Sequence, residues 1–292
     1  MKVSGFTFIR NAIKLDYPIV EAIQSILPLC DEVIVAVGNS EDDTLGLIQS
    51  IDPSKIKIIE TIWDDTLREN GAVLADETNK AFQSISKDSD WAFYIQGDEV
   101  IHEKDRAEIR AKMELYVNDL EVDGLLFSYQ HFYGSYDFIG ASNNWYKNEI
   151  RIIRNSANIY SYRDAQGFRK DDNQKLNVAK IAADVYHYGW VKSPAQMRKK
   201  QKESAAFWND DAQMEKIIQS PDFYDFSEFD SLERFTGTHP NVMLDRIERK
   251  NWVIDLDVSK KKLSFKKFVL YYFEKLTGIR PFNFKNYKII RS

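Results

Sequence analysis

Hydrophobic and polar positions along the first hundred residues alternate between the two periods of regular secondary structure. Short apolar runs rich in β-branched and aromatic residues predict strands, and apolar residues spaced by three and four predict helices. The predicted strands are residues 3–9, 32–37, 55–62 and 91–95, and the predicted helices are residues 17–29, 42–51 and 70–85. Strands and helices that alternate in this order are typical of βαβ units and a parallel sheet.

The pattern changes after residue 99. One further helix is expected over residues 104–118, followed by strand-like runs with few helices between them: residues 124–133, 148–154, 158–162 and 179–188. From residue 193 onward the pattern is mainly helical. We therefore expect an α/β fold, Rossmann-like, with a mostly parallel sheet, helices on both faces and a mixed, partly antiparallel extension. Residues 1–192 would form this domain, and residues 193–292 a helical C-terminal region.

Composition and charge narrow the class of protein. The chain has 292 residues, 43% hydrophobic and 29% charged, with a formal net charge of −5, which excludes a disordered or fibrous chain. Residues 259–292 carry ten basic residues and one acid, so the tail is +9 and the first 258 residues are −14. An acidic body argues against nucleic-acid binding.

Several features are absent from the sequence. The single cysteine, Cys30, excludes an intrachain disulfide and a cysteine-based zinc site. The N-terminal residues do not resemble a signal peptide, and there is no apolar run of 18 residues that would predict a transmembrane helix. We expect a cytoplasmic protein.

In parallel α/β sheets, ligands bind at the carboxyl ends of the strands. The strand at residues 91–95 is followed by Gln96, Gly97, Asp98 and Glu99. Adjacent acids at such a strand end can present a carboxylate to Mg²⁺ or Mn²⁺, which prefer oxygen ligands shared with substrate phosphates. The alternative is a solvated turn followed by a helix cap.

Three other polar segments could carry chemistry. Residues 38–44, which include Asp42, could bind a ribose or a base edge, or could only cap a helix. His187 lies between aromatic residues at a strand end and could be a metal ligand, an acid or base, or a half-buried structural histidine. Asp164 follows Arg163 and could be a general base toward a hydroxyl, or one half of an ion pair at a turn.

Common nucleotide and hydrolase motifs are missing. No G-x-G-x-x-G follows the first strand, and neither G-x-x-x-x-G-K-[ST], G-x-S-x-G nor H-E-x-x-H occurs. These absences disfavour a dinucleotide dehydrogenase, a P-loop enzyme, an α/β hydrolase and a zinc protease of those types.

Together, the segments resemble the GT-A fold glycosyltransferases, and among them the family 2-like enzymes. The resemblance covers about residues 1–190, and its order and spacing are more specific than any one motif. It is carried by FTFIRN at residues 6–11, DEVIV at 31–35, NSEDDT at 39–44, Asn70-Gly71, Asn79, QGDE at 96–99 and His187-Tyr188-Gly189. The tetrapeptide at 96–99 stands at the family's DxD position, although Gln96 replaces the first acid and supplies no charge.

The resemblance implies an inverting glycosyltransferase. The donor would be a UDP- or GDP-linked sugar, the acceptor a hydroxyl of a glycan or lipid-linked molecule, and the cofactor Mn²⁺ or Mg²⁺. Asp98 and His187 would bind the metal ion, with more of its binding falling on Asp98 because of Gln96. The nucleotide-binding residues implied are Arg10, Asn11, Asp42, Arg68, Gln96 and Asp98.

The resemblance also implies a carboxylate that takes the proton from the acceptor hydroxyl. Asp164 fits this role best, because the family often has an acid between the extended sheet and the histidine strand. Glu99, Asp171 and Asp172 remain alternatives as the base.

Two other functions stay open. A sugar-phosphate nucleotidyltransferase shares the α/β start but needs a glycine-rich loop after the first strand, and residues 10–14 contain no glycine. A non-catalytic homologue that binds nucleotide or glycan without transfer is the second alternative, and Gln96 is the residue that favours it.

The basic tail has two interpretations. Apolar residues at 265, 268, 269, 272, 273 and 276 have helical spacing, with lysines between them. Such a helix could rest on an anionic membrane with its lysines at the headgroups, at the inner face of the cytoplasmic membrane, where an enzyme of envelope polysaccharide synthesis would meet a lipid-linked acceptor. Alternatively, the aromatic residues pack on the acidic domain.

Overall fold

The computed structural model describes residues 1–209, 211–219, 221–282 and 285–291. Within these residues, thirteen strands form one branched sheet. The strands are β1 (Val3–Ile9), β2 (Glu32–Gly38), β3 (Ile56–Thr61), β4 (Trp91–Tyr94), β5 (Glu99–Ile101), β6 (Gly124–Tyr133), β7 (Phe138–Gly140), β8 (Asn148–Arg154), β9 (Ile159–Tyr162), β10 (Gly167–Lys170), β11 (Gln174–Trp190), β12 (Leu232–Arg234) and β13 (Tyr287–Arg291).

Helices connect and cover these strands. They are α1 (Ile19–Ile26), α2 (Thr44–Gln49), α3 (Ala72–Gln83), α4 (Arg106–Tyr116), α5 (Pro194–Ser204), α6 (Asp211–Ile218), α7 (Leu244–Glu248) and α8 (Phe265–Thr277). Short 3-10 turns cover Leu27–Leu29, Glu69–Gly71, Glu103–Asp105, Ala205–Phe207 and Asn241–Met243.

The sheet has a parallel half and a mixed half. Its main strand order is β3-β2-β1-β4-β8-β6-β11-β10-β9, and β3, β2, β1 and β4 are mutually parallel. β8 runs antiparallel to both β4 and β6, and β11 is parallel to β6. Strands β1, β4, β6 and β11 therefore point the same way, and their carboxyl ends meet at one edge. The predicted α/β class with a mixed extension is confirmed.

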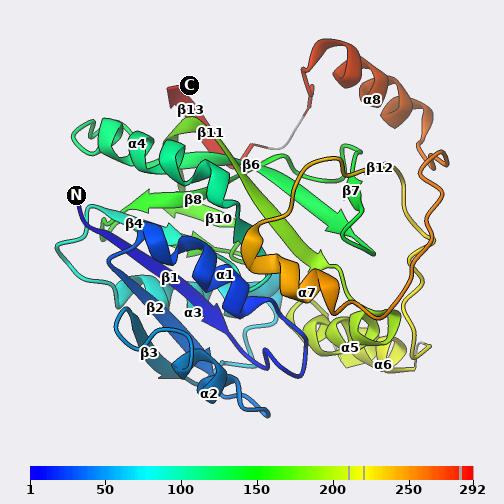
Figure 1. The fold of residues 1–292 in the computed structure, drawn as a ribbon, viewed down its shortest axis with the longest axis horizontal. Coiled ribbons are helices and arrows are strands. Elements are labelled where there is room, and N and C mark those ends of the chain that lie inside the picture. The colour runs from blue at the N-terminus through cyan, green and yellow to red at the C-terminus, as the bar shows by residue number, and fades with distance from the viewer. Residues whose placement is uncertain (210, 220, 283–284, 292) are drawn as a thin grey trace.

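The core lies on both faces of the sheet because side chains alternate along each strand. On β4, Trp91 and Phe93 pack in the layer that contains residues of α1 and α4, whereas Ala92 and Tyr94 pack in the layer that contains Phe82 of α3. Figure 1 shows α1 and α4 on the near face and α3 behind the sheet. Each large apolar side chain so buried stabilises the fold by about 1.5–3 kcal/mol.

A buried ion pair links β8 to β5. Arg151 of β8 donates to both carboxylate oxygens of Glu99 on β5, at 2.7 and 2.5 Å, and both side chains are fully buried. Tyr129 of β6 donates to the same carboxylate. Removing one partner of such a pair leaves an uncompensated charge and costs about 3–5 kcal/mol.

The structure adds elements that the periodicity does not predict. The strand expected at 179–188 is longer, since β11 spans Gln174–Trp190, and the residues directly after Asp98 form β5 instead of entering a helix. β5, β7, β10 and β12 are three or four residues long, too short to show a period. They form because neighbouring strands supply hydrogen-bond partners.

The described part of residues 193–292 contains four α-helices, and two strands there join the sheet. β12 pairs with β7, and β13 pairs in parallel with β11. Figure 1 shows α5 and α6 beside the sheet, and α8 standing at the margin of the molecule. Over the described residues, no helix is both long enough and apolar enough to cross a bilayer. The division at residue 192 remains a prediction.

Candidate active site

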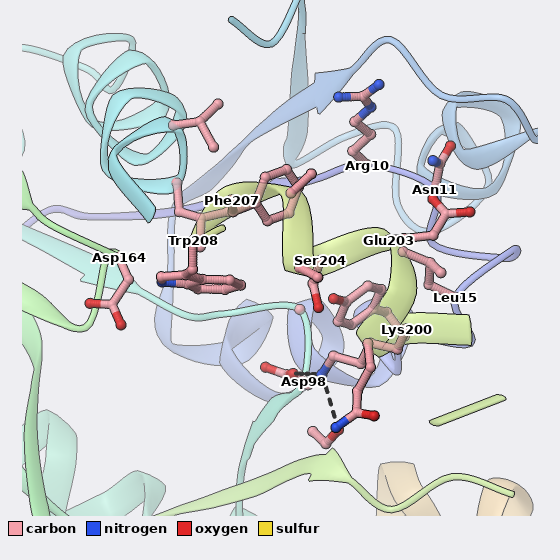
Figure 2. Close-up of a pocket in the computed structure, with 18 of the residues that line it drawn as sticks. Arg10, Asn11, Leu15, Asp98, Asp164, Lys200, Glu203, Ser204, Phe207 and Trp208 are labelled. Carbon is pink, nitrogen blue, oxygen red and sulfur yellow. Dashed lines mark hydrogen bonds and ion pairs between the residues drawn. The ribbon is translucent and has the colours of Figure 1, made fainter. Parts of the chain in front are cut away.

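A cavity of about 1000 Å³ opens at the carboxyl ends of the strands. Its walls come from the ends of β1, β4 and β11, the loop after β3, and helix α5 with the turn that follows it. Figure 2 shows the α5 segment lying between Arg10 and Asp164. Most of the residues predicted for the site line this cavity: Arg10, Asn11, Arg68, Gln96, Asp98, Asp164 and His187.

The end of β1 supplies one wall. The Arg10 guanidinium lies 5.5 Å from the Trp63 ring centroid and donates to Asp65 at 3.0 Å. Asn11 is buried in a left-handed conformation with φ of 54°, and its side-chain oxygen accepts from the Glu41 amide at 2.7 Å. Asn11 thereby ties the loop after β2 to the end of β1.

Asp42 does not line the cavity. One carboxylate oxygen accepts from the Lys14 amide at 2.6 Å, and the other accepts from the Thr44 amide at 3.0 Å. The carboxylate is engaged by backbone amides of its own loop and of the loop after β1, and it lies outside the cavity lining, so we withdraw the nucleotide-binding role expected for it. The helix cap is the neighbouring Asp43, which accepts from the Gly46 amide at 3.1 Å.

Gln96 and Arg68 do line the cavity. The Gln96 side-chain amide donates to the Tyr94 hydroxyl at 3.3 Å and to the Ala165 carbonyl at 3.2 Å. It therefore links the end of β4 to the loop that carries Asp164. The Arg68 side chain donates to the Asp65 carbonyl at 3.2 Å, which keeps a second guanidinium at the wall formed after β3.

Asp98 and His187 are brought together by pairing between β5 and β11. The Tyr188 amide donates to the Asp98 carbonyl at 2.8 Å, and Nε2 of His187 lies 3.7 Å from Oδ1 of Asp98. The other carboxylate oxygen accepts from Nζ of Lys200 at 2.9 Å, and the same ammonium donates to the Gly189 carbonyl at 3.0 Å. A dashed line at Asp98 in Figure 2 marks its contact with Lys200.

The charges of this cluster follow from burial and pairing. Burial alone would raise the pKa of the Asp98 carboxyl, but Lys200 and His187 outweigh burial and hold the pKa below its usual value. Burial lowers the pKa of His187, so its imidazole is neutral near pH 7. Burial acts against the charge on Lys200, yet Tyr17 and Asp98 raise the pKa of its ammonium. The site is thus an ionised pair beside a neutral imidazole.

The chemistry of Asp98 and His187 fits a divalent cation. They offer a carboxylate oxygen and a neutral imidazole nitrogen, both suitable for Mn²⁺. A β-carbon placed on Gly189 would lie 2.5 Å from Nε2 of His187 and 2.6 Å from Oδ2 of Asp98, so this glycine keeps the space beside both groups open. Within the described residues, no three His, Cys, Asp or Glu side chains gather as a metal-binding group. Further ligands would have to come from substrate and water.

Glu99 does not line the cavity. Its carboxylate is fully buried and held by Arg151 and Tyr129, as described for the core. An acceptor hydroxyl cannot reach it, so we withdraw Glu99 as a candidate base. Its position in the sequence placed it beside Asp98, but the strand pleat turns the two side chains to different surroundings.

Asp164 does line the cavity, at its far end from Arg10. Its carboxylate accepts from Gln166 at 3.0 Å, and burial raises its pKa above the usual value. A β-carbon on Gly71, where φ is 70°, would lie 2.8 Å from Asp164 and 3.0 Å from the Trp208 indole nitrogen, so these side chains border the same space. The alternative acids Asp171 and Asp172 are exposed in the turn after β10 and lie outside the lining.

The prediction from sequence missed the part of the site that follows β11. Lys200 and the aromatic side chains of this segment line the cavity, and the Phe207 ring packs 5.5 Å from that of Trp63. Lys14 pairs with Glu203, which ties α5 to the loop after β1. The sequence offered one cue to this part of the site, which is that Trp190 directly follows the histidine motif.

No protein-family model matches the chain, and no curated protein sequence matches it. Solved structures with a similar fold include S. aureus TarS (residues 1–349), with 16% identity over 75% of this chain and 69% of that one and a TM-score of 0.40. Glucosyl-3-phosphoglycerate synthase from Mycobacterium tuberculosis, solved with Mn²⁺, UDP and glucosyl-3-phosphoglycerate, has 18% identity over 46% of this chain and 45% of that one and a TM-score of 0.30.

A third similar structure is a 4-diphosphocytidyl-2C-methyl-D-erythritol synthase from Anaerococcus prevotii. It has 10% identity over 53% of this chain and 70% of that one, with a TM-score of 0.31. At these identities and TM-scores, the alignments describe a partial likeness of fold.

Proposed function

We propose that the chain is a glycosyltransferase that moves a sugar from a UDP- or GDP-linked donor to a hydroxyl of a glycan or lipid-linked acceptor, with inversion. The observation that carries the proposal is the convergence of Asp98, His187 and Asp164 on one large cavity at the carboxyl edge of the sheet. The sequence resemblance to GT-A enzymes assigns the same residues to the donor and acceptor.

The wall at the end of β1 suits a nucleoside diphosphate. Trp63 and Phe8 offer apolar surface to a base, and the Arg10 and Arg68 guanidinium groups are cationic donors suited to phosphate oxygens. Asn11 holds the loop that shapes this wall. Positive groups near the diphosphate stabilise the charge that develops on it as the leaving group.

Asp98 and His187 would hold the divalent ion, Mn²⁺ or Mg²⁺, that the resemblance implies. When bound, such an ion supplies charge neutralisation at a diphosphate. The residues themselves contribute an ionised carboxylate and a neutral imidazole, in a pocket that leaves each only about 12% exposed. Because Gln96 is uncharged, Asp98 is the one acid of its tetrapeptide that faces the ligand.

Asp164 is proposed as the general base. A raised pKa makes the Asp164 carboxylate a stronger base toward the proton of an attacking hydroxyl. Trp208 and Trp190, which line the same cavity, offer flat apolar faces against which a sugar ring can pack. A single base on the acceptor side fits direct displacement, which inverts the anomeric carbon.

A binding protein without catalysis is the second candidate. Gln96 favours it, because the side chain that replaces an acid is engaged by Tyr94 and Ala165. A nucleotidyltransferase is a weaker third candidate, because the loop after β1 has no glycine to cradle a triphosphate.

We also propose that the protein works in the cytoplasm at the inner face of the membrane, in the synthesis of a cell-envelope polysaccharide. The support is α8, whose residues Phe265 and Leu276 are 84% and 86% exposed. Lysines flank this apolar face, as an anionic lipid surface requires.

The test of function is a panel of UDP- and GDP-sugars with Mn²⁺. UDP or GDP present at about 100 times its dissociation constant should stabilise the fold by about 2.7 kcal/mol, measured as a rise in the unfolding midpoint. Asp98→Asn should reduce this shift, and Asp172→Asn, an exposed acid outside the cavity, should retain it.

Release of nucleoside diphosphate from a donor distinguishes the candidates. Release in the wild type supports a transferase, whereas binding without release across many acceptors supports the non-catalytic alternative. If no nucleotide binds the wild type, the proposed function is wrong.

A further inference from the structure

The buried ammonium of Lys200 is a feature that the sequence resemblance does not explain. It bridges Oδ2 of Asp98, at 2.9 Å, and the Gly189 carbonyl, at 3.0 Å. The Lys200 and Asp98 side chains are only 17% and 12% exposed, so this is not a surface ion pair. Lys200 also lies over the Tyr17 ring, 4.8 Å from its centroid. Its position is therefore fixed from three sides.

Lys200 stands where a cation bound by Asp98 and His187 would need ligands. The same Oδ2 atom that accepts from Lys200 borders the space kept open at Gly189, and Nε2 of His187 borders it too. At 3.7 Å from Oδ1 of Asp98, the imidazole makes no hydrogen bond with that carboxylate. Oδ2 of Asp98 is thus engaged by Lys200, whereas within the described residues no hydrogen bond engages Oδ1 of Asp98 or Nε2 of His187.

We propose that Lys200 and a divalent metal ion are alternative counter-cations for Asp98, so that the site carries its own positive charge when no metal ion is bound. The two cations need the lone pairs of one carboxylate, and they repel each other at short range. An ammonium carries one charge and donates hydrogen bonds, so it can also bind a phosphate oxygen. The metal part of this proposal rests only on residues of the site, whereas the phosphate part rests on the proposed function.

The arrangement of α5 supports a dedicated position for Lys200. Ser193 caps this helix by accepting from the Gln196 amide, and Met197 is buried beneath it. The helix therefore points Lys200 at Asp98 while its neighbour Lys199 is exposed. Lys199 supplies a matched control with the same charge on the same helix.

The first test measures Mn²⁺ affinity without nucleotide by electron paramagnetic resonance. Lys200→Met should bind Mn²⁺ about tenfold more tightly than the wild type, because the competing ammonium is gone. Lys200→Arg, which keeps the charge, and Lys199→Met should both resemble the wild type. Equal affinity in Lys200→Met and the wild type would overturn the proposal. Circular dichroism checks the fold, and a misfolded Lys200→Met leaves the decision to Lys200→Gln.

The second test measures UDP binding by calorimetry in EDTA and in Mn²⁺. In EDTA the wild type should bind UDP, and Lys200→Met should bind about tenfold more weakly, with Mn²⁺ restoring its affinity. Unchanged binding by Lys200→Met in EDTA would overturn the phosphate role. If no variant binds UDP but Lys200→Met still gains Mn²⁺ affinity, the proposed function fails and the competition at Asp98 stands.

Discussion

Asp164 is the residue on which the proposed proton transfer depends. Its carboxylate lines the cavity beside Trp208, and burial raises its pKa. Asp164→Asn should lower the rate of nucleoside diphosphate release by about 10²–10⁴-fold, because an amide cannot take a proton from the attacking hydroxyl. Affinity for UDP should not change, since the donor wall lies at the end of β1. Steady-state release assays and calorimetry measure the two quantities.

The matched control for this substitution is Asp171→Asn in the exposed turn after β10. Its release rate should equal that of the wild type. The base must be ionised to act, so the wild-type rate should fall as the pH drops through the raised pKa of Asp164. A full release rate in Asp164→Asn would exclude this residue as the base.

The position of a residue along the chain predicts that it belongs to the site only where its side chain must face the edge of the sheet. Asp98 follows β4 and His187 lies near the end of β11, two strands whose carboxyl ends meet, and the structure brings the two side chains together. Asp42 and Glu99 also follow strands, yet Asp42 is bound by the Lys14 amide of the loop after β1, and Glu99 is bound by Arg151. Such pairings are set by tertiary contacts, which the local pattern does not contain.

At the scale of elements, the long periodic segments were predictable and the short ones were not. β6 and β8 have the bounds that their apolar runs indicate, Gly124–Tyr133 and Asn148–Arg154. β13, at Tyr287–Arg291, forms because β11 is long enough to offer it a pairing edge. The polar sequence of α5 gave no sign that this helix lines the cavity, because its contribution depends on the turn that brings it back across the sheet.

The orientation of α8 bears on the two interpretations of the tail. Tyr271 and Glu274 are buried against the body, whereas Phe265 and Leu276 face outward. The outward face is a stripe of apolar side chains, and the exposure of Phe265 and Leu276 favours the membrane interpretation over packing on the acidic domain. Its members are Phe265, Phe268, Val269, Tyr272, Phe273 and Leu276.

This stripe predicts binding to anionic vesicles. Flotation with vesicles that contain phosphatidylglycerol should recover the wild type, and vesicles of phosphatidylcholine alone should recover less. The double substitution Phe265→Ser and Leu276→Ser should lower the vesicle partition coefficient by about tenfold, because two apolar side chains no longer enter the lipid.

Leu120→Ser is the control for the double variant, since Leu120 is 80% exposed but lies after α4, away from the stripe. It should float like the wild type. Equal flotation of the wild type and the double variant would contradict the proposed membrane association but not the proposed transferase activity.

At the scale of the whole molecule, the stability of the fold is linked to pH through a buried carboxyl group. Glu149 of β8 is 4% exposed, and one of its oxygens has no hydrogen-bond partner within the described part of the chain. The guanidinium of its neighbour Arg151 lies 4.0 Å away and already donates two hydrogen bonds to Glu99. Burial raises the pKa of Glu149 to about 8; Arg151 opposes the rise, while Glu99 and Asp164 add to it.

A carboxyl group with a raised pKa in the folded state makes folding favour the protonated form. The pKa of this carboxyl group is about 4.3 in the unfolded chain and about 8 in the folded protein. Between these pH values the folded state holds up to one proton more than the unfolded state, so the free energy of unfolding should fall by up to about 1.4 kcal/mol for each unit that the pH rises. Glu149→Gln removes this term while keeping the shape of the side chain. The variant should therefore gain stability relative to the wild type as the pH rises from 5.5 to 7.5, a window taken within that range of about 4.3 to 8.

Urea unfolding at several pH values measures this difference, and it cancels groups that titrate alike in both proteins. Glu60→Gln, an exposed change on β3, should give a difference from the wild type that does not vary with pH. A constant difference for Glu149→Gln would show that Glu149 is ionised in the folded protein. In that case Arg151 would have to neutralise two carboxylates, and the ion pair with Glu99 that links β8 to β5 would be weaker than its geometry indicates.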